Sequence, residues 1–138
     1  MQDMQAFNRA LIEEFRANGG KLSGQLANST LLLLTTLGAK SGAERVTPLG
    51  FVKDGERLIV IAANAGAPTH PDWYYNLLAH PEVTLEIGSE RFTAQATIAD
   101  VAERSRLIAL VPYFNAQQEK TSRVIPIVVL TPQRGDSE

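Results

Sequence analysis

The chain has 138 residues, of which 44% are hydrophobic and 20% charged, and its formal net charge is −2. This composition predicts one globular domain over residues 1–138 and excludes a disordered or collagen-like chain. Without an excess of Lys and Arg, no nucleic-acid partner is expected. The lack of cysteine excludes disulfides, thiolate nucleophiles and cysteine-ligated metals.

The N-terminal residues 4–17 have the pattern of an amphipathic helix. Phe7, Leu11 and Phe15 recur every four residues, and Gly19 follows the last of them. Such a helix packs on the body of a domain or covers a substrate, and one helix can do both. The same three apolar side chains leave weak contact with a lipid surface open.

A membrane-spanning segment is not expected, since the longest apolar run, Leu31 to Leu34, is far too short to cross a bilayer. Residues Met1 to Arg16 have no apolar core of the signal-peptide type. We therefore expect a cytoplasmic protein.

Three strands are predicted in the next part of the chain. Residues 29–36 are rich in Leu and Thr and predict a buried strand, and residues 45–53 and 57–63 predict two more. The turn between the last two, Lys53 to Glu56, contains Asp-Gly, which is a strong hairpin signal.

A loop rich in Gly and Pro, residues 64–71, leads to a short helix predicted over residues 72–79, which begins after Pro71 or with Asp72 as its cap. A second hairpin follows, with strands over residues 82–88 and 91–98.

The last elements are a helix, a strand and a tail. Asp100 is placed to cap a helix that runs to Leu110, with Glu103 as its capping-box partner and Pro112 beyond the end. Residues 125–131 predict the last strand, and residues 133–138 are a polar tail.

The order of these elements excludes the regular alternation of strand and helix that builds a parallel sheet. We expect an α+β, mainly β fold: a six- to seven-stranded antiparallel barrel with peripheral helices. No dinucleotide fingerprint, phosphate loop of the Walker type or nucleophile elbow is present. His70 and His80 have no companions at metal-ligand spacing, so no metal is expected, and His70 is assigned a structural hydrogen bond.

The segment from Thr35 to Arg45 concentrates groups that suit an anion. Lys40 and Arg45 supply positive charge, and Gly42 lets the backbone bend so that several N–H groups face one point. A solvated hairpin turn has a similar composition, so the residues alone leave both interpretations open.

The segment from Ala62 to Gly66 consists of small residues and one Asn, which would let a flat ring lie close to the backbone. Trp73, the one tryptophan, follows nearby. Trp73 and Leu77 are four residues apart, so they also suit simple packing of the helix on the barrel.

Four ordered stretches resemble a known family. Thr35 to Leu49 match Thr-Thr-x-Gly-x-Lys-Ser-Gly-x-x-Arg-x-Thr-Pro-Leu, and Gly66 to Leu77 match Gly-Ala-Pro-x-His-Pro-x-Trp-Tyr-x-Asn-Leu. Residues 14–21 and 123–132 fit as well. With this spacing over nearly the whole chain, the sequence resembles the deazaflavin-dependent nitroreductases, which are similar to the flavin-binding split β-barrels.

The resemblance implies an F420-dependent oxidoreductase. It would transfer a hydride from reduced coenzyme F420 to a small unsaturated acceptor such as a quinone, an enone or a nitro compound. F420 is a deazaflavin with an anionic phospholactyl–oligoglutamate tail. Lys40 and Arg45 would hold that tail, helped by amides near Ser41 and Gly42. The implied cofactor-binding residues are Lys40, Ser41, Gly42, Arg45, Thr47, Pro48, Ala62, Ala63, Asn64, Ala65, Gly66 and Trp73.

On the substrate side, Trp73, Tyr113 and Phe114 are the candidates, with the proton donor and the physiological substrate left open. Ala39 and Asn64 stand where family members often have cations, which implies weaker tail binding. Val111, Phe114 and Gln117 stand where the nitroimidazole-reducing members have tyrosines.

Three alternatives stay open: an FMN-dependent oxidoreductase on the same barrel, a non-catalytic carrier of F420 or of an apolar ligand, and a barrel that serves only as an interaction module. Split barrels often pair through their sheets, so a homodimer is an open alternative to a monomer, and the oligomeric state is left undecided.

Overall fold

The computed structural model describes residues 4–22 and 30–133. One seven-stranded antiparallel sheet, in the order β2-β1-β5-β6-β7-β4-β3, organises them. The strands are β1 (Leu31–Leu37), β2 (Glu44–Gly50), β3 (Val52–Asp54), β4 (Arg57–Ile61), β5 (Glu82–Ile87), β6 (Glu90–Ile98) and β7 (Ile127–Pro132). The helices are α1 (Met4–Ala17), α2 (Asp72–Ala79), α3 (Val101–Ile108) and α4 (Phe114–Gln118), with a 3-10 turn, η2, over Asn64–Gly66.

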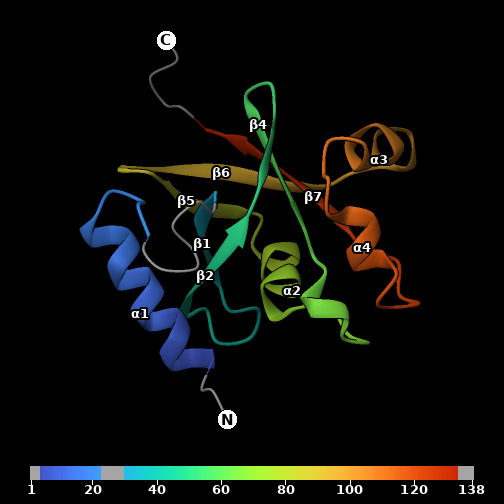
Figure 1. The fold of residues 1–138 in the computed structure, drawn as a ribbon. Helices are drawn as coiled ribbons and strands as arrows, with labels where there is room; N and C mark the ends of the chain where they lie inside the picture. Colours follow the sequence, from blue (N-terminus) through green and yellow to red (C-terminus); the bar gives the residue numbers. More distant parts are fainter. Residues whose placement is uncertain (1–3, 23–29, 134–138) are drawn as a thin grey trace.

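The sheet curls into a barrel because its two edge strands are neighbours in the chain. β2 ends at Gly50 and β3 begins at Val52, so the single residue Phe51 joins the two edges. Phe51 is 8% exposed and belongs to the core. The edges of the sheet therefore lie close together, as the curled ribbon in Figure 1 shows.

This crossing corrects the continuous strand predicted over residues 45–53. Its first part pairs with β1, with Leu34 opposite Thr47, and its last part pairs with β4, with Val52 opposite Ile59. The predicted turn after it is confirmed, since Asp54 pairs with Arg57 around Gly55, whose φ is 62°.

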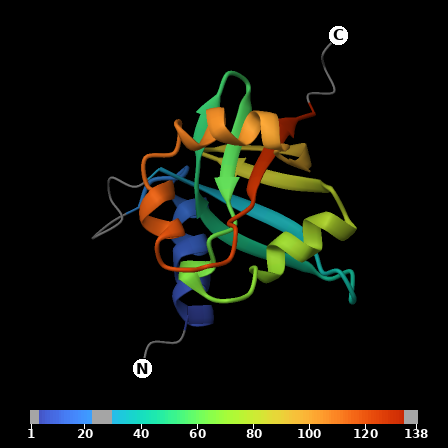
Figure 2. The same cartoon turned by 90° about the vertical axis from the view of Figure 1, so that its right-hand side faces the viewer.

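Two apolar clusters lie on opposite faces of the sheet. In β4, Leu58 and Val60 belong to the cluster inside the barrel, whereas Ile59 and Ile61 belong to the cluster under α3 and α4. β7 alternates in the same way, which explains why its sequence reads as a continuous apolar run. Figures 1 and 2 show α3 and α4 on one side of the barrel and α1 on the other.

Helix α1 has the predicted bounds and packs on the barrel. Leu11 and Phe15 are 8% and 1% exposed, so these two side chains are not available to a lipid surface, in contrast to the expectation from the sequence. Near its end, Arg16 makes two hydrogen bonds of 2.9 and 2.7 Å to the carboxylate of Glu86 on β5. The helix is therefore fixed to the sheet at its C-terminal end.

The cap of α3 is confirmed, since the Asp100 carboxylate accepts the N–H of Glu103 at 2.8 Å. The capping box is only half formed. The side chain of Glu103 instead accepts from Arg57 at 3.0 Å and from Arg106 at 3.4 Å. The helix ends at Ile108, two residues before the predicted end, and α4 was not located from the sequence.

The remaining bounds differ by a few residues from the predictions. The hairpin of β5 and β6 and the helix α2 are confirmed, and β1 extends to Leu37, while residue 29 lies outside the described residues. β4 stops at Ile61, and β7 begins at Ile127 rather than at residue 125. The N–H of Ile125 donates instead to the Gln118 side chain, 3.1 Å away, outside the sheet ladder.

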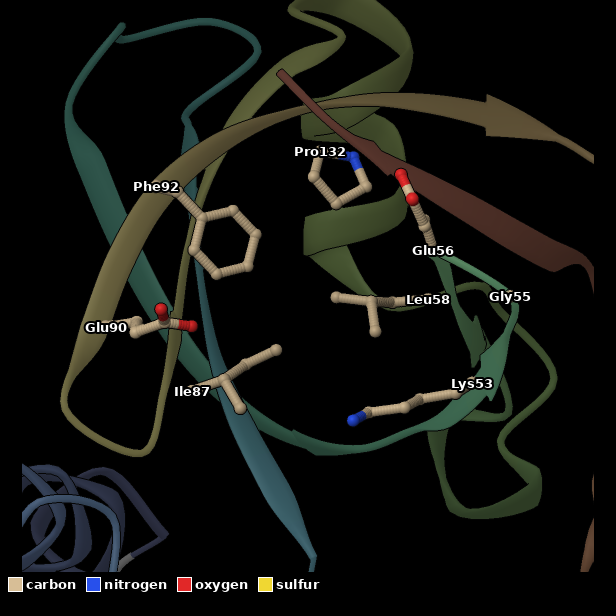
Figure 3. A pocket seen from close by; sticks show the side chains of 8 residues that line it. All are labelled: Lys53, Gly55, Glu56, Leu58, Ile87, Glu90, Phe92 and Pro132. Carbon is tan, nitrogen blue, oxygen red and sulfur yellow. The ribbon is translucent and has the colours of Figure 1, made fainter. Parts of the chain in front are cut away.

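The barrel is open at the end formed by the β3–β4 and β5–β6 turns. A cavity of about 500 Å³, here called the far cavity, lies there. Leu58, Ile87 and Phe92 point into it, and the Lys53 side chain extends inward toward Ile87 (Figure 3).

Candidate functional site

Two adjoining cavities lie at the opposite end of the barrel, where the β1–β2 hairpin, α2 and the loop after β4 meet. The hairpin cavity, of about 780 Å³, is lined by the β1–β2 hairpin, β2 and α2. The bend cavity, of about 500 Å³, is lined by β2, the η2 bend and the start of α4. Asn8, Thr47 and Trp73 line both, so the two cavities meet across these side chains.

The β1–β2 hairpin closes through a compact set of hydrogen bonds. The N–H of Gly38 donates to the carbonyl of Ala43 at 2.7 Å, and the N–H of Gly42 donates back to the carbonyl of Gly38 at 2.8 Å. The Ser41 hydroxyl accepts the N–H of Ala43 at 3.1 Å. A Cβ added to Gly38 would lie 2.6 Å from Ser41 Oγ, so a side chain at position 38 would displace the Ser41 hydroxyl from its bond to Ala43.

These bonds decide which amides of the turn are free. The N–H of Gly42 is already used, which corrects the expectation that it faces a ligand; Gly42 instead supplies a φ of 72°. Within the described residues, the N–H groups of Lys40 and Ser41 have no protein acceptor. Two adjacent free amides at a cavity are typical of anion sites.

The cations of this hairpin are unpaired. Across residues 4–22 and 30–133, neither Lys40 nor Arg45 has a carboxylate within ion-pair distance, whereas Arg16, Arg57, Arg91 and Arg106 all do. Lys40 and Arg45 both line the hairpin cavity. The site thus combines two uncompensated positive charges with two free amides, which suits a phosphate or carboxylate.

The η2 bend is backbone in an unusual conformation. Asn64 and Ala65 have φ values of 52° and 55°, and Gly66 follows with 84°. For Ala this left-handed conformation costs about 1–2 kcal/mol. Asn64 is supported by its own side chain, whose Nδ2 donates to the carbonyl of Thr69 at 2.9 Å. Strained backbone of this kind clusters at ligand sites.

Arg123 holds this loop, which the sequence did not reveal. Its guanidinium donates to the carbonyls of Ala62, Ala63 and Ala67 at 3.1, 2.7 and 3.2 Å. It also lies 2.6 Å from Nδ1 of His70. Because arginine only donates, Nδ1 is the acceptor, and burial followed by the Arg123 charge lowers the pKa of His70. The predicted structural hydrogen bond of His70 is confirmed.

Trp73 and Tyr113 both line the bend cavity. Trp73 is 7% exposed and belongs to the barrel core, so it packs the helix and also lines both cavities. Tyr113 is 36% exposed, but its hydroxyl lies close to Gly50, where an added Cβ would be 3.6 Å from it. Burial raises the pKa of Tyr113, so its hydroxyl is protonated at neutral pH.

Most of the predicted site residues border the two cavities. These are Lys40, Ser41, Arg45, Thr47, Pro48, Ala63, Asn64, Ala65, Trp73 and Tyr113. Sequence reasoning missed Asn8, which lines both cavities. Gln117, singled out only as a position where other members have a tyrosine, lines the bend cavity with Tyr113. Gln117 lies four residues after Tyr113, so the two side chains share one face of the helical segment.

Three predicted residues, besides Gly42, do not border either cavity. Phe114 is 3% exposed and packs in the cluster under α3 and α4, with the Arg104 guanidinium over its ring, which corrects its assignment to the substrate side. Ala62 is fully buried in the barrel core. Gly66 lies against the residues that follow α4, where an added Cβ would be 2.6 Å from that of Lys120.

Residues 4–22 and 30–133 contain no cluster of three His, Asp or Glu side chains suited to a metal ion. No helix in the same two ranges has the length and apolar character needed to cross a membrane.

Comparisons with known proteins place this geometry in context. The sequence model of a family described as F420H(2)-dependent quinone reductase matches residues 7–132. An F420H(2)-dependent quinone reductase of Mycobacterium tuberculosis (strain H37Rv) is 36% identical over 125 residues, which are 85% of this chain and 84% of that protein.

Two solved structures are also similar. That of an F420-H2 dependent reductase has a TM-score of 0.65 and 32% identity, covering 73% of this chain and 93% of that chain. A chain described as a domain-swapped dimer has a TM-score of 0.67 and 28% identity, covering 93% of this chain and 99% of that chain.

Proposed function

Because the chain belongs to the F420H(2)-dependent quinone reductase family, we propose that its two adjoining cavities together hold coenzyme F420. The membership confirms the expected family, the split-barrel fold, the coenzyme and the enzyme class. The acceptor class is narrowed to quinone-like molecules. The individual binding residues and their roles are the proposal.

The residues present suit the two parts of the coenzyme. In the hairpin cavity, Lys40, Arg45 and the free N–H of Ser41 would hold the anionic tail. In the bend cavity, the backbone from Ala63 to Ala65 would border the deazaflavin ring opposite Thr47. Thr47 pairs with Leu34 across the ladder and so faces the barrel interior with it. Pro48 is tolerated because β2 is an edge strand.

Reduced F420 supplies the hydride when it is bound, so the protein supplies orientation and exclusion of water. Trp73 of α2 and Asn8 of α1 line both cavities. The quinone-like acceptor would enter the bend cavity beside Tyr113. The protonated Tyr113 hydroxyl is the proposed proton donor to the product.

The observation that carries this assignment is the pair of unpaired cations, Lys40 and Arg45, beside two free amides in one cavity. A charge-assisted hydrogen bond contributes about 1.5–3 kcal/mol. The substitution Lys40→Ala should therefore weaken F420 binding about ten- to hundredfold. Lys53→Ala is the matched control, because Lys53 lines the far cavity at the other end of the barrel.

The test is a fluorescence titration of the wild-type protein and both variants with F420, followed by oxidation of the reduced complex by a panel of quinones, enones and nitro compounds. Wild-type affinity in Lys40→Ala would contradict the assignment. Tighter binding of FMN than of F420 would favour the FMN alternative, and tight F420 binding without oxidation by any acceptor would favour a carrier.

The homodimer and the cytoplasmic location are also proposals. The similarity to a chain described as a domain-swapped dimer supports the first. Sedimentation of the purified chain and fractionation of the producing cells test the two separately.

A further inference from the structure

Arg123 lies outside both cavities but controls the loop that borders one of them. It precedes β7, and its guanidinium reaches back to residues more than fifty positions earlier in the chain. Its four acceptors lie on both sides of the η2 bend: the carbonyls of Ala62 and Ala63 come before it, and the carbonyl of Ala67 and the ring of His70 come after it.

Arg123 therefore holds together the two chain segments on either side of a strained turn, which are called its stems here. Between the stems, Asn64 and Ala65 hold left-handed backbone and face the bend cavity. Local bonds inside the turn, from Gly66 N–H to Ala63 and from Ala67 N–H to Asn64, measure 3.0 and 2.9 Å. A strained turn persists when contacts from its surroundings hold it in place. Arg123 supplies four such contacts from a different part of the chain.

The acceptors explain why the residue is an arginine. Three carbonyl oxygens and one imidazole nitrogen converge on a single group, and a planar guanidinium has five N–H donors in a fixed fork. A lysine ammonium has three donors on one nitrogen and cannot span four acceptors spread around the loop. Among the described residues, no carboxylate forms an ion pair with Arg123, and the hydrogen bonds of its guanidinium all go to the loop.

We propose that Arg123 is a positioning residue for the coenzyme: it fixes the Asn64–Gly66 bend in the shape that the deazaflavin ring needs, without touching the ring itself. This inference rests on the proposed location of F420 in the bend cavity. It assigns a function in binding to a residue that lines neither cavity.

The test compares Arg123→Met, Arg123→Lys and Arg106→Met with the wild type. Arg106 is the matched control, since it also makes several hydrogen bonds, to Asp54 and Glu103, but none to the loop. Two measurements are made: hydrogen exchange of the Gly66 and Ala67 amides without ligand, and F420 affinity together with kcat and the KM for a quinone.

In Arg123→Met, both amides should exchange at least about tenfold faster and F420 affinity should fall about tenfold or more, which corresponds to about 1.4 kcal/mol. Arg123→Lys should recover part of both effects. In Arg106→Met, the two amides and the F420 affinity should stay near their wild-type values even if the melting temperature falls.

Wild-type F420 affinity in Arg123→Met, or weaker affinity without faster exchange of the two amides, would overturn the inference. If Arg123→Met does not fold, Arg123→Lys is judged by the same two measurements, amide exchange and F420 affinity. If the wild type itself does not bind F420, the proposed function fails, whereas the exchange measurement still reports whether Arg123 holds the bend.

Discussion

Asn76 on α2 accepts a hydrogen bond of 2.9 Å from the backbone N–H of Ala39 at the start of the β1–β2 turn. The same side chain donates to Thr36 Oγ1 at 3.2 Å and is 7% exposed. One buried amide therefore connects α2 to the hairpin that presents Lys40. Because Asn76 uses both its oxygen and its nitrogen, neither an apolar nor an acidic residue can replace it without loss.

The substitution Asn76→Ala should lower both stability and F420 affinity. It leaves the Ala39 N–H and the Thr36 hydroxyl without their partner, which costs about 1–3 kcal/mol for a buried group. Asn76→Asp keeps the acceptor for Ala39 but loses the donor to Thr36 and adds a negative charge beside the tail site. We expect Asn76→Asp to weaken F420 binding more than Asn76→Ala does. Denaturant unfolding and F420 titration measure the two effects, and equal affinities in the two variants would contradict the charge argument.

Gly66→Ala should destabilise the protein more than Gly55→Ala. Both glycines have positive φ, 84° and 62°, so both substitutions strain the backbone. At Gly66 the new Cβ would also lie 2.6 Å from Cβ of Lys120, whereas at Gly55 nothing lies within 4 Å. Gly55→Ala should cost about 1–2 kcal/mol from backbone strain, and Gly66→Ala more. The difference between the unfolding free energies of the two variants gives the steric part directly. Similar values would mean that the segment around Lys120 moves aside freely.

The substitution Ala65→Gly should stabilise the protein, which is unusual for an exposed alanine. Ala65 has a φ of 55°, and the left-handed conformation costs about 1–2 kcal/mol for Ala, more than the roughly 0.4–1 kcal/mol of chain entropy that glycine adds to the unfolded state.

Ala63→Gly provides the control for this substitution. Ala63 has an ordinary φ of −76° and ψ of −33°, so the same chemical change two residues earlier should destabilise by about 0.5–1 kcal/mol. Stability changes of opposite sign in the two variants, measured by thermal unfolding, would support the strain at Ala65. Equal losses of stability would refute it.

Much of this site is predictable from the sequence because its signals are local. The periodicity of residues 4–17 and the Pro before residue 72 place α1 and α2 correctly. Lys40 and Arg45 are close in sequence within one hairpin, which brings them to one cavity. The crossing from one sheet edge to the other at Phe51 could not be predicted from local sequence. It depends on which strands the two halves of residues 45–53 pair with.

The clamp by Arg123 could not be predicted for the same reason. Its acceptors lie 53 to 61 positions away, and three of them are backbone carbonyls, which carry no side-chain signal. Helix α4 spans five residues, fewer than two turns, so no periodicity marks it, and Phe114 consequently stood out as a substrate-side aromatic although it is a core residue.

The ion pair between Arg16 and Glu86 should make the anchoring of α1 depend on pH. The hydrogen bonds and charge of Arg16 outweigh burial and lower the pKa of Glu86 below its ordinary value of 4.5. The folded protein therefore binds fewer protons than the unfolded chain in this range, so the contribution of the pair is complete above about pH 4.5 and is lost as the pH falls through the lower folded-state pKa.

The substitution Glu86→Gln should remove this dependence. At neutral pH the variant should lose about 1 kcal/mol, a value moderated by the 44% exposure of the Arg16 side chain. The difference in unfolding free energy between wild type and variant should shrink toward zero as the pH falls below 4.5. Arg9→Gln is the control, since Arg9 has no carboxylate partner among residues 4–22 and 30–133. A wild-type–variant difference that stays constant from pH 7 to acid would show that the pair does not anchor the helix through its charge.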